Sequence, residues 1–301
     1  MTKIAITGGT GFVGTRLIEL ALYAGHQVRA LTRRAQPARQ GVTWIGGDLE
    51  TPQALAELCA GADAVIHVAG VVNAPDRAGF AAGNIEGTRN MLDAAKHVGG
   101  RRFVHVSSLA AREPELSAYG WSKAQGDALV QASGLDWTIV RPPAIYGPGD
   151  LEMLELFKLA NRGLALLPGN GRISLIEVSD LGHLLLALAT TGTCPHILDP
   201  DDGRDGGWTH REFAHAIGAA TGRRIVAINL PRPALLAGAW LDQLARGKGA
   251  KLTPDRVDYF FHPDWVSDPD RRPPSSLWVP RVETFAGLAR TAAWYRERGL
   301  L

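Results

Sequence analysis

The feature that most constrains the fold is a glycine-rich turn, residues 7–14, which directly follows the short apolar run Ile4-Ala5-Ile6. The run predicts a buried strand, and the apolar spacing after the turn predicts a helix. A strand, a glycine turn and a helix form the first part of a βαβ unit that binds dinucleotides, because backbone amides and the helix N-terminus then face a pyrophosphate. We therefore expect a pyrophosphate to be bound by Gly8, Gly11, Phe12, Val13 and Gly14.

Composition narrows the class of protein. A chain of 301 residues, 46% hydrophobic and 21% charged, is typical of a globular protein with one large domain or two smaller ones. A formal charge of +2 gives no general case for nucleic-acid binding. The two cysteines, Cys59 and Cys194, lack metal-ligand spacing, so we expect no metal site and a cytoplasmic location. No signal peptide or transmembrane segment is visible.

A second predicted strand, residues 26–31, is followed by Thr32, Arg33 and Arg34. In a dinucleotide-binding sheet this strand end lies beside the adenosine ribose, where an acidic residue would bind the 2′-hydroxyl of NAD. Two guanidinium groups suit a 2′-phosphate instead, so we expect NADP (NADPH) as cofactor, with NAD the second choice. The alternative interpretation of the two arginines is a solvated basic loop.

Two further strand ends offer candidate contacts. Asp48 follows a third predicted strand and could bind the adenine amino group or simply serve as a turn residue. The fourth predicted strand, residues 64–70, ends in Ala69 and Gly70, small residues that allow backbone to pass close to a ligand. His67 lies within this strand, which favours a packed core histidine over a catalytic one.

The fifth predicted strand, residues 102–106, leads into Ser107 and Ser108, and a helix then begins near Tyr119 and contains Lys123. Residues four apart share a helix face, so the Lys123 ammonium can stabilise the phenolate of Tyr119 and lower its pKa. Tyr119 could then exchange a proton with a carbonyl or alcohol oxygen while a serine hydroxyl polarises the same oxygen.

In their order and approximate spacing, these pieces resemble the extended short-chain dehydrogenase/reductase family, which includes the NAD-dependent epimerases and dehydratases. The resemblance covers nearly the whole chain. Its motifs are TGGTGFVG at residues 7–14, Gly47-Asp48-Leu49, Asn84 to Thr88, Ser107-Ser108, Tyr119 to Lys123, Arg141 to Pro148, and a tail containing Trp294-Tyr295-Arg296.

For the catalytic step, the resemblance implies that Tyr119 is the general acid/base and that Lys123 holds the ribose hydroxyls and tunes the tyrosine. Ser108 matches the catalytic serine. Ser107 is the alternative for that role and is also implied to contact the cofactor. Asn84 matches either an asparagine that braces the site or a residue on a helix surface.

For the cofactor, the resemblance implies that Asp48 and Leu49 flank adenine. It also implies that Ala69 and Gly70 pass beside the nicotinamide ribose, and that Pro142 belongs to the segment next to the carboxamide.

Some departures from the family pattern narrow the activity. Of the two acids common near residues 178–180 only Asp180 remains, with Glu177 where a histidine is frequent, and no acid follows Ser108. These departures disfavour sugar-nucleotide dehydratases, and Arg33 and Arg34 disfavour epimerases that retain NAD. The remaining resemblance is to the dihydroflavonol-reductase and 3-beta-hydroxysteroid-dehydrogenase branches.

The sequence predicts an α/β fold, a Rossmann-type doubly wound parallel sheet with a smaller, mostly helical C-terminal substrate lobe. We expect residues 1–147, with 172–200 returning to them, to form the NADP-binding domain, and residues 148–171 and 201–301 to form the lobe. Aromatic residues in the lobe or next to it either line an apolar pocket or pack the core of the lobe; they are Tyr146, Trp240, Tyr259, Phe260 and Trp265. The segment 235–244 is open to a further interpretation as a membrane-surface helix.

The sequence therefore predicts an NADP-dependent oxidoreductase that interconverts an alcohol and a carbonyl on a small, rather apolar molecule. The oligomeric state stays open, although family members often pair and a homodimer is therefore one option. Two alternatives stay open: a nucleotide-sugar epimerase with bound NAD, and a non-catalytic sensor of the NADPH/NADP ratio.

Overall fold

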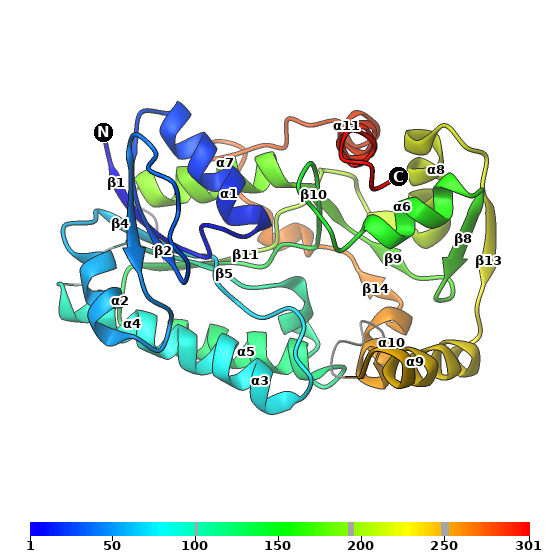
Figure 1. Ribbon diagram of the computed structural model, residues 1–301, viewed down its shortest axis with the longest axis horizontal. Coiled ribbons are helices and arrows are strands. Elements are labelled where there is room, and N and C mark those ends of the chain that lie inside the picture. The colour runs from blue at the N-terminus through cyan, green and yellow to red at the C-terminus, as the bar shows by residue number, and fades with distance from the viewer. Residues whose placement is uncertain (100–101, 192–195, 248–252) are drawn as a thin grey trace. The chain divides into compact units, whose positions relative to one another are not determined.

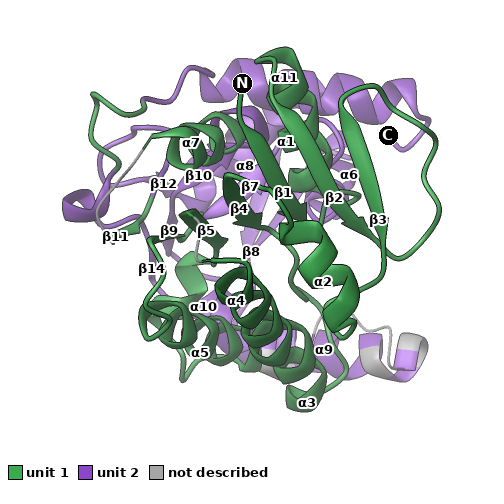
Figure 2. Cartoon of the chain, turned by 90° about the vertical axis from the view of Figure 1, so that its left-hand side faces the viewer, with its two compact units in different colours: residues 1–142, 181–199, 273–278 green, residues 143–180, 200–272, 279–301 purple. Residues whose placement is uncertain are grey.

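The computed structural model describes residues 1–99, 102–191, 196–247 and 253–301, which form the two compact units coloured in Figure 2. Unit 1 comprises residues 1–142, 181–199 and 273–278. Unit 2 comprises residues 143–180, 200–272 and 279–301. Cys194 lies outside the described residues.

Unit 1 contains a seven-stranded sheet in which every neighbouring pair is parallel. The order β11-β6-β5-β4-β1-β2-β3 reverses direction at β1, as in doubly wound dinucleotide-binding sheets. The Rossmann-type fold class predicted from sequence is confirmed. The strands are β1 (Lys3–Thr7), β2 (Gln27–Thr32), β3 (Val42–Gly46), β4 (Ala64–His67), β5 (Arg102–Val106), β6 (Trp137–Val140) and β11 (His196–Leu198).

Helices cover both faces of this sheet (Figure 1). On one face α1 and α7 pack so closely that a Cβ on Gly182 would lie 2.6 Å from Leu20 Cδ1. On the other face, apolar residues of α2, α4 and α5 pack against the sheet in one core cluster. The helices are α1 (Phe12–Tyr23), α2 (Pro52–Cys59), α3 (Arg77–Ala81), α4 (Gly87–His97), α5 (Ala118–Gln131) and α7 (Val178–Thr190), with a π-helix η1 (Ala82–Glu86) before α4 and a 3₁₀ helix η2 (Leu109–Arg112) before α5.

Unit 2 is mostly helical, with small sheets between its helices. Aromatic and aliphatic side chains of α6, α8 and α11, including Phe157, Phe213 and Tyr295, form its core. Thr209 and Glu212 form a capping box at the start of α8. The helices are α6 (Leu154–Asn161), α8 (His210–Thr221), α9 (Arg232–Arg246), α10 (Pro254–Phe261), the 3₁₀ helix η4 (Pro269–Arg271) and α11 (Thr284–Glu297). The strands are β7 (Ala144–Tyr146), β8 (Leu164–Leu167), β9 (Arg172–Ile173), β10 (Leu175–Glu177), β12 (Trp208–Thr209), β13 (Val226–Asn229) and β14 (Asp264–Trp265).

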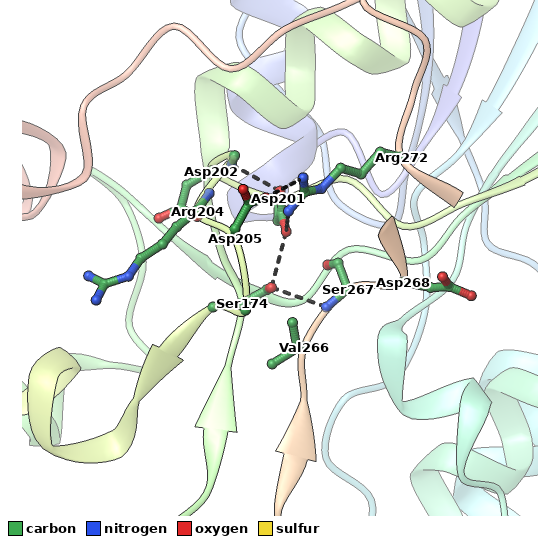
Figure 3. Close-up of polar contacts among 12 residues, drawn as sticks. Ser174, Asp201, Asp202, Arg204, Asp205, Val266, Ser267, Asp268 and Arg272 are labelled. Carbon is green, nitrogen blue, oxygen red and sulfur yellow. Dashed lines mark hydrogen bonds and ion pairs between the residues drawn. The ribbon is translucent and has the colours of Figure 1, made fainter. Parts of the chain in front are cut away.

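A polar cluster around Asp201 connects three segments of unit 2 (Figure 3). Asp201 is 2% exposed; its carboxylate accepts hydrogen bonds from Gly203 N (2.9 Å) and Ser174 Oγ (3.2 Å). Arg272 Nη2 lies 3.5 Å from the same carboxylate, while Arg272 Nη1 donates to Asp205, whose side chain is 93% exposed. Burial raises the pKa of Asp201, so this carboxylate depends on its partners to stay ionised.

Helix α9 exposes Trp240, Leu241 and Leu244, while Ala239 is buried. Within the described part of the chain, none of the helices combines the length and apolar character needed to cross a bilayer.

Candidate functional site

The glycine turn between β1 and α1 requires close backbone packing. Gly8 has φ +71°, and a Cβ there would lie 2.8 Å from Ala69 N, at the end of β4. A Cβ on Gly14 would overlap the carbonyl of Gly8, to which Gly11 N also donates. Side chains at these positions would separate β1, β4 and the start of α1.

No side chain caps the start of α1. Its N-cap is Gly11, so the first backbone amides, those of Phe12, Val13 and Gly14, receive no side-chain oxygen from the cap position. Such an end can receive an anionic oxygen from a ligand, and the dipole of the 12-residue helix favours that charge. The turn therefore fits the pyrophosphate of a dinucleotide.

Arg33 and Arg34 line a cavity of about 410 Å³ at the carboxyl end of β2. Both side chains are exposed, and Thr32 Oγ1 shapes the loop by donating to Arg34 O at 2.7 Å. Gln36 and Trp44 also line this cavity, although the sequence analysis did not select them. Trp44 could have been found because its strand pairs directly with β2.

The side chain of Asp48 stabilises the turn that precedes α2. Its Oδ1 accepts from Thr51 Oγ1 (2.8 Å) and Glu50 N (3.0 Å), and these hydrogen bonds, with a smaller effect of Arg33, lower its pKa. Leu49 packs against Gly87, and its carbonyl accepts from Asn90 Nδ2 at 2.8 Å. Asp48 is thus held by hydrogen bonds within its own turn, and Leu49 is held by contacts with α4.

Asn84 lies in the π-helix η1 and is 3% exposed, so a helix-surface role does not apply. Its side chain pairs with both backbone groups of Val71, accepting from N at 2.7 Å and donating to O at 2.9 Å. It also donates to Ser122 Oγ at 2.9 Å, and that hydroxyl donates to Tyr119 O. Asn84 therefore joins the loop after β4 to helix α5.

Ser107 and Ser108 differ in accessibility. Ser107 is buried, whereas Ser108 is partly exposed and caps η2 by accepting from Ala110 N. This segment packs against the start of α5, since a Cβ on Gly120 would lie 2.7 Å from Ala110 O. Beside it, Leu109 N donates to Pro142 O at 3.0 Å, which brings Pro142 next to the serine segment.

Tyr119 and Lys123 occupy successive turns of α5. Tyr119 is partly exposed and lies 6.0 Å from Phe80, ring centre to ring centre. Lys123 is buried, and its Nζ donates to Val106 O at 2.9 Å. A Cβ added to Gly70 would lie 3.6 Å from the same Nζ. Burial lowers the pKa of Lys123 to about 8, opposed by Asp127.

Asp127, one turn beyond Lys123, belongs to a buried polar group that the sequence analysis missed. Arg141 Nε donates to Asp127 Oδ2 at 2.8 Å, and His105 Nε2 lies 3.7 Å from Oδ1. Burial raises the pKa of Asp127 while Arg141 opposes this, and burial and then Lys123 lower the pKa of His105. The spacing of Lys123 and Asp127 could have indicated this group, because residues i and i+4 share a helix face.

In unit 2, the acids near residue 180 are used structurally. Asp180 accepts from Arg281 N and Val282 N, and buried Glu177 accepts from Ser179 N. The candidate pocket aromatics divide into two groups: Tyr146 and Trp265 are buried, whereas Trp240 and Phe260 are exposed. The ring of Tyr259 packs against that of Trp265 in a tilted arrangement, 4.5 Å between ring centres.

A parallel doubly wound sheet with an uncapped glycine turn defines the class of nucleotide-binding Rossmann proteins. In agreement, residues 8–156 match a family model described as NAD(P)H-binding.

Over the whole chain, the protein is 37% identical to the ceramide reductase of Caulobacter vibrioides, covering 99% of this chain and 96% of that protein. It is 28% identical to the 3-beta-hydroxysteroid dehydrogenase of Mycolicibacterium neoaurum, covering 79% and 76%. A human epimerase family protein solved with NADPH, SDR39U1, has the same fold at a TM-score of 0.74 and 21% identity, covering 97% of this chain and 99% of that one. The chain belongs to the extended short-chain dehydrogenase/reductase family, and it is an NAD(P)-dependent oxidoreductase.

Proposed function

We propose that this protein is an NADPH-dependent reductase that converts the ketone of an apolar, lipid-like molecule to an alcohol. The observation that carries the proposal is the arrangement on α5, where the buried Lys123 lies one turn from the partly exposed Tyr119. A protein that only sensed a dinucleotide would need no such tyrosine.

In this proposal, bound NADPH would supply the hydride that the carbonyl carbon takes up. Tyr119 gives its phenolic proton to the carbonyl oxygen, which completes the alcohol. Ser108 donates a hydrogen bond to the same oxygen and holds it. Lys123 binds the ribose hydroxyls, and its positive charge stabilises the phenolate that Tyr119 becomes.

The charges of unit 1 support NADPH over NADH. Arg33 and Arg34 line the cavity beside β2, where the sheet topology is expected to receive the adenosine ribose. Guanidinium groups bind phosphate oxygens through charge-assisted hydrogen bonds. We therefore assign to unit 1 the cofactor and to unit 2 the recognition of the substrate.

The substrate class rests on the similarity to the Caulobacter protein, whose name specifies a ceramide. Alcohol–carbonyl chemistry on such a lipid means reduction of its keto form. A keto-ceramide is therefore the first substrate to assay, with a ketosteroid and a UDP-sugar as comparisons.

Replacing Tyr119 by Phe tests the proposal. We expect turnover of the keto-lipid to fall about 100- to 10,000-fold, the range for a lost general acid, while NADPH fluorescence titration gives an unchanged affinity. Tyr23→Phe, at a site 94% exposed, is the matched control and should turn over normally. Normal turnover by Tyr119→Phe, or epimerisation of the UDP-sugar by protein purified with bound NAD, would contradict it.

A further inference from the structure

A chain of hydrogen bonds runs through His67 between two parts of the candidate site. Ala69 N donates to Thr7 Oγ1 at 3.1 Å, and Thr7 Oγ1 lies 2.7 Å from His67 Nδ1. On the other side of the ring, His67 Nε2 lies 3.2 Å from Thr88 Oγ1, which donates to Asn84 O at 2.8 Å. The side chains of Thr7, His67 and Thr88 are all at most 1% exposed.

The direction of each proton in this chain follows from chemistry. A carbonyl oxygen only accepts, so the Thr88 hydroxyl gives its single proton to Asn84 O. The contact between Thr88 and the ring must then be a donation from His67 Nε2–H. A neutral ring has one proton, and with that proton on Nε2 the Nδ1 atom is an acceptor. It therefore accepts from the Thr7 hydroxyl, which in turn accepts from Ala69 N–H.

The surroundings keep this ring neutral. Burial and then the charge of Lys123 lower the pKa of His67 to about 3. His105, its register partner on β5, stacks on it at 5.4 Å between ring centres and is also buried. Asp127 Oδ1 lies 3.7 Å from His105 Nε2, and Oδ2 of the same carboxylate accepts from Arg141 Nε.

The two ends of this series of hydrogen bonds hold one short loop at both of its ends. Ala69 is the residue that Thr7 holds, and Val71 is held by the side chain of Asn84. Gly70 lies between these two residues. A Cβ added to Gly70 would be 3.0 Å from Asn84 Oδ1 and 3.6 Å from Lys123 Nζ.

We propose that His67, as the neutral Nε2–H tautomer, is a positioning residue that holds the loop 69–71 and Asn84 in the geometry that binds the nicotinamide half of the cofactor. The effect on the cofactor rests on the proposed function, whereas the tautomer does not. His67 acts through Thr7 and Thr88 and does not take part in the reaction itself.

Paired substitutions separate positioning from core packing. His67→Leu and His105→Leu remove equally buried rings from neighbouring strands, but the His105 ring nitrogens have no hydrogen-bond partner among the described residues. We expect His67→Leu to weaken NADPH binding about tenfold, or about 1.4 kcal/mol, and His105→Leu to leave it within twofold. His67→Gln, which can still donate to Thr88, and His67→Asn, which can still accept from Thr7, should each recover part of the NADPH affinity that His67→Leu loses.

Nitrogen-15 spectra of histidine-labelled protein test the tautomer without any substrate. We expect the His67 Nε2 signal to be that of a protonated nitrogen and the Nδ1 signal that of a bare acceptor, both unchanged from pH 8 to pH 5.5. An Nδ1–H tautomer, titration within this range, or equal losses of affinity in the two leucine variants would overturn the proposal. If wild-type protein fails to bind NADPH, the proposed function fails, and the spectra still decide the tautomer.

Discussion

The side-chain amide of Asn84 donates a 2.9 Å hydrogen bond to the hydroxyl of Ser122, so the π-helix after β4 is tied to the helix that carries Tyr119 and Lys123. The same asparagine holds both backbone groups of Val71. One buried side chain therefore sets the distance between the loop after β4 and α5.

Asn84→Ala should lower both stability and turnover. It leaves the partly buried backbone N–H and C=O of Val71 without these partners, which costs up to about 1–3 kcal/mol for each group that stays unsatisfied. Ser122→Ala removes only one of the three Asn84 side-chain contacts and should cost less in each measurement. Urea unfolding and kcat of the two variants check this order, and a larger loss in Ser122→Ala would contradict it.

Arg33→Ser combined with Arg34→Ser should change the cofactor preference. Charge-assisted hydrogen bonds to phosphate contribute about 1.5–3 kcal/mol, so kcat/KM with NADPH should fall roughly 10- to 150-fold. Activity with NADH, which has no 2′-phosphate, should change little. Arg39→Ser is the control, because this exposed arginine follows in the same loop but does not line the cavity. Equal losses with both cofactors would show that the arginines do not read the phosphate.

Lys123 should make stability depend on pH above pH 8. Its pKa is about 8 in the folded protein against an ordinary value of 10.5. Below pH 8 the lysine is charged in both the folded and the unfolded protein, so the full cost of burying its charge is present. Between pH 8 and 10.5 the unfolded chain binds more protons than the folded protein, so the free energy of unfolding rises with pH. The total rise corresponds to roughly 3 kcal/mol.

Lys123→Met removes this dependence. Urea unfolding of both proteins without cofactor from pH 7 to pH 10 gives their difference in unfolding free energy. That difference should shift in favour of the wild type as the pH rises, while a constant difference would show that Lys123 is not titrating in this range.

Asp201 and Asp205 share Arg272 but should contribute unequally to stability. Asp201 is buried and accepts from Ser174 Oγ and Gly203 N, so Asp201→Ala should cost about 1–3 kcal/mol for each of these donors that stays unsatisfied, while Arg272, 30% exposed, keeps Asp205. Asp205 is exposed, so Asp205→Ala should cost less than about 1 kcal/mol. Thermal unfolding of the two variants compares them directly, and similar losses would contradict this difference in burial.

Much of unit 1 follows from local patterns in the sequence. Apolar runs predicted β1, β2, β4 and β5, and the apolar spacing after the glycine turn predicted α1. Those signals are local, because strand burial and the apolar face of a helix depend on residues close together in the sequence.

The remaining features depend on contacts that are distant in sequence. The burial of Asn84 follows from the π-helical turn and from Ser122, 38 residues away. Tyr146, expected at a pocket wall or in the core, is fully buried in unit 2 because Gly287 of α11 leaves room for its hydroxyl. No local spacing reveals such pairings.

The seven-stranded sheet has a consequence for synthesis of the chain. Its edge strand β11 pairs with β6, and unit 1 is completed only by residues 273–278. While the ribosome makes the residues between β6 and β11, the edge of β6 is unpaired and open to other strands. A nascent chain stalled before His196 should therefore present a chaperone-binding edge that is covered once β11 emerges.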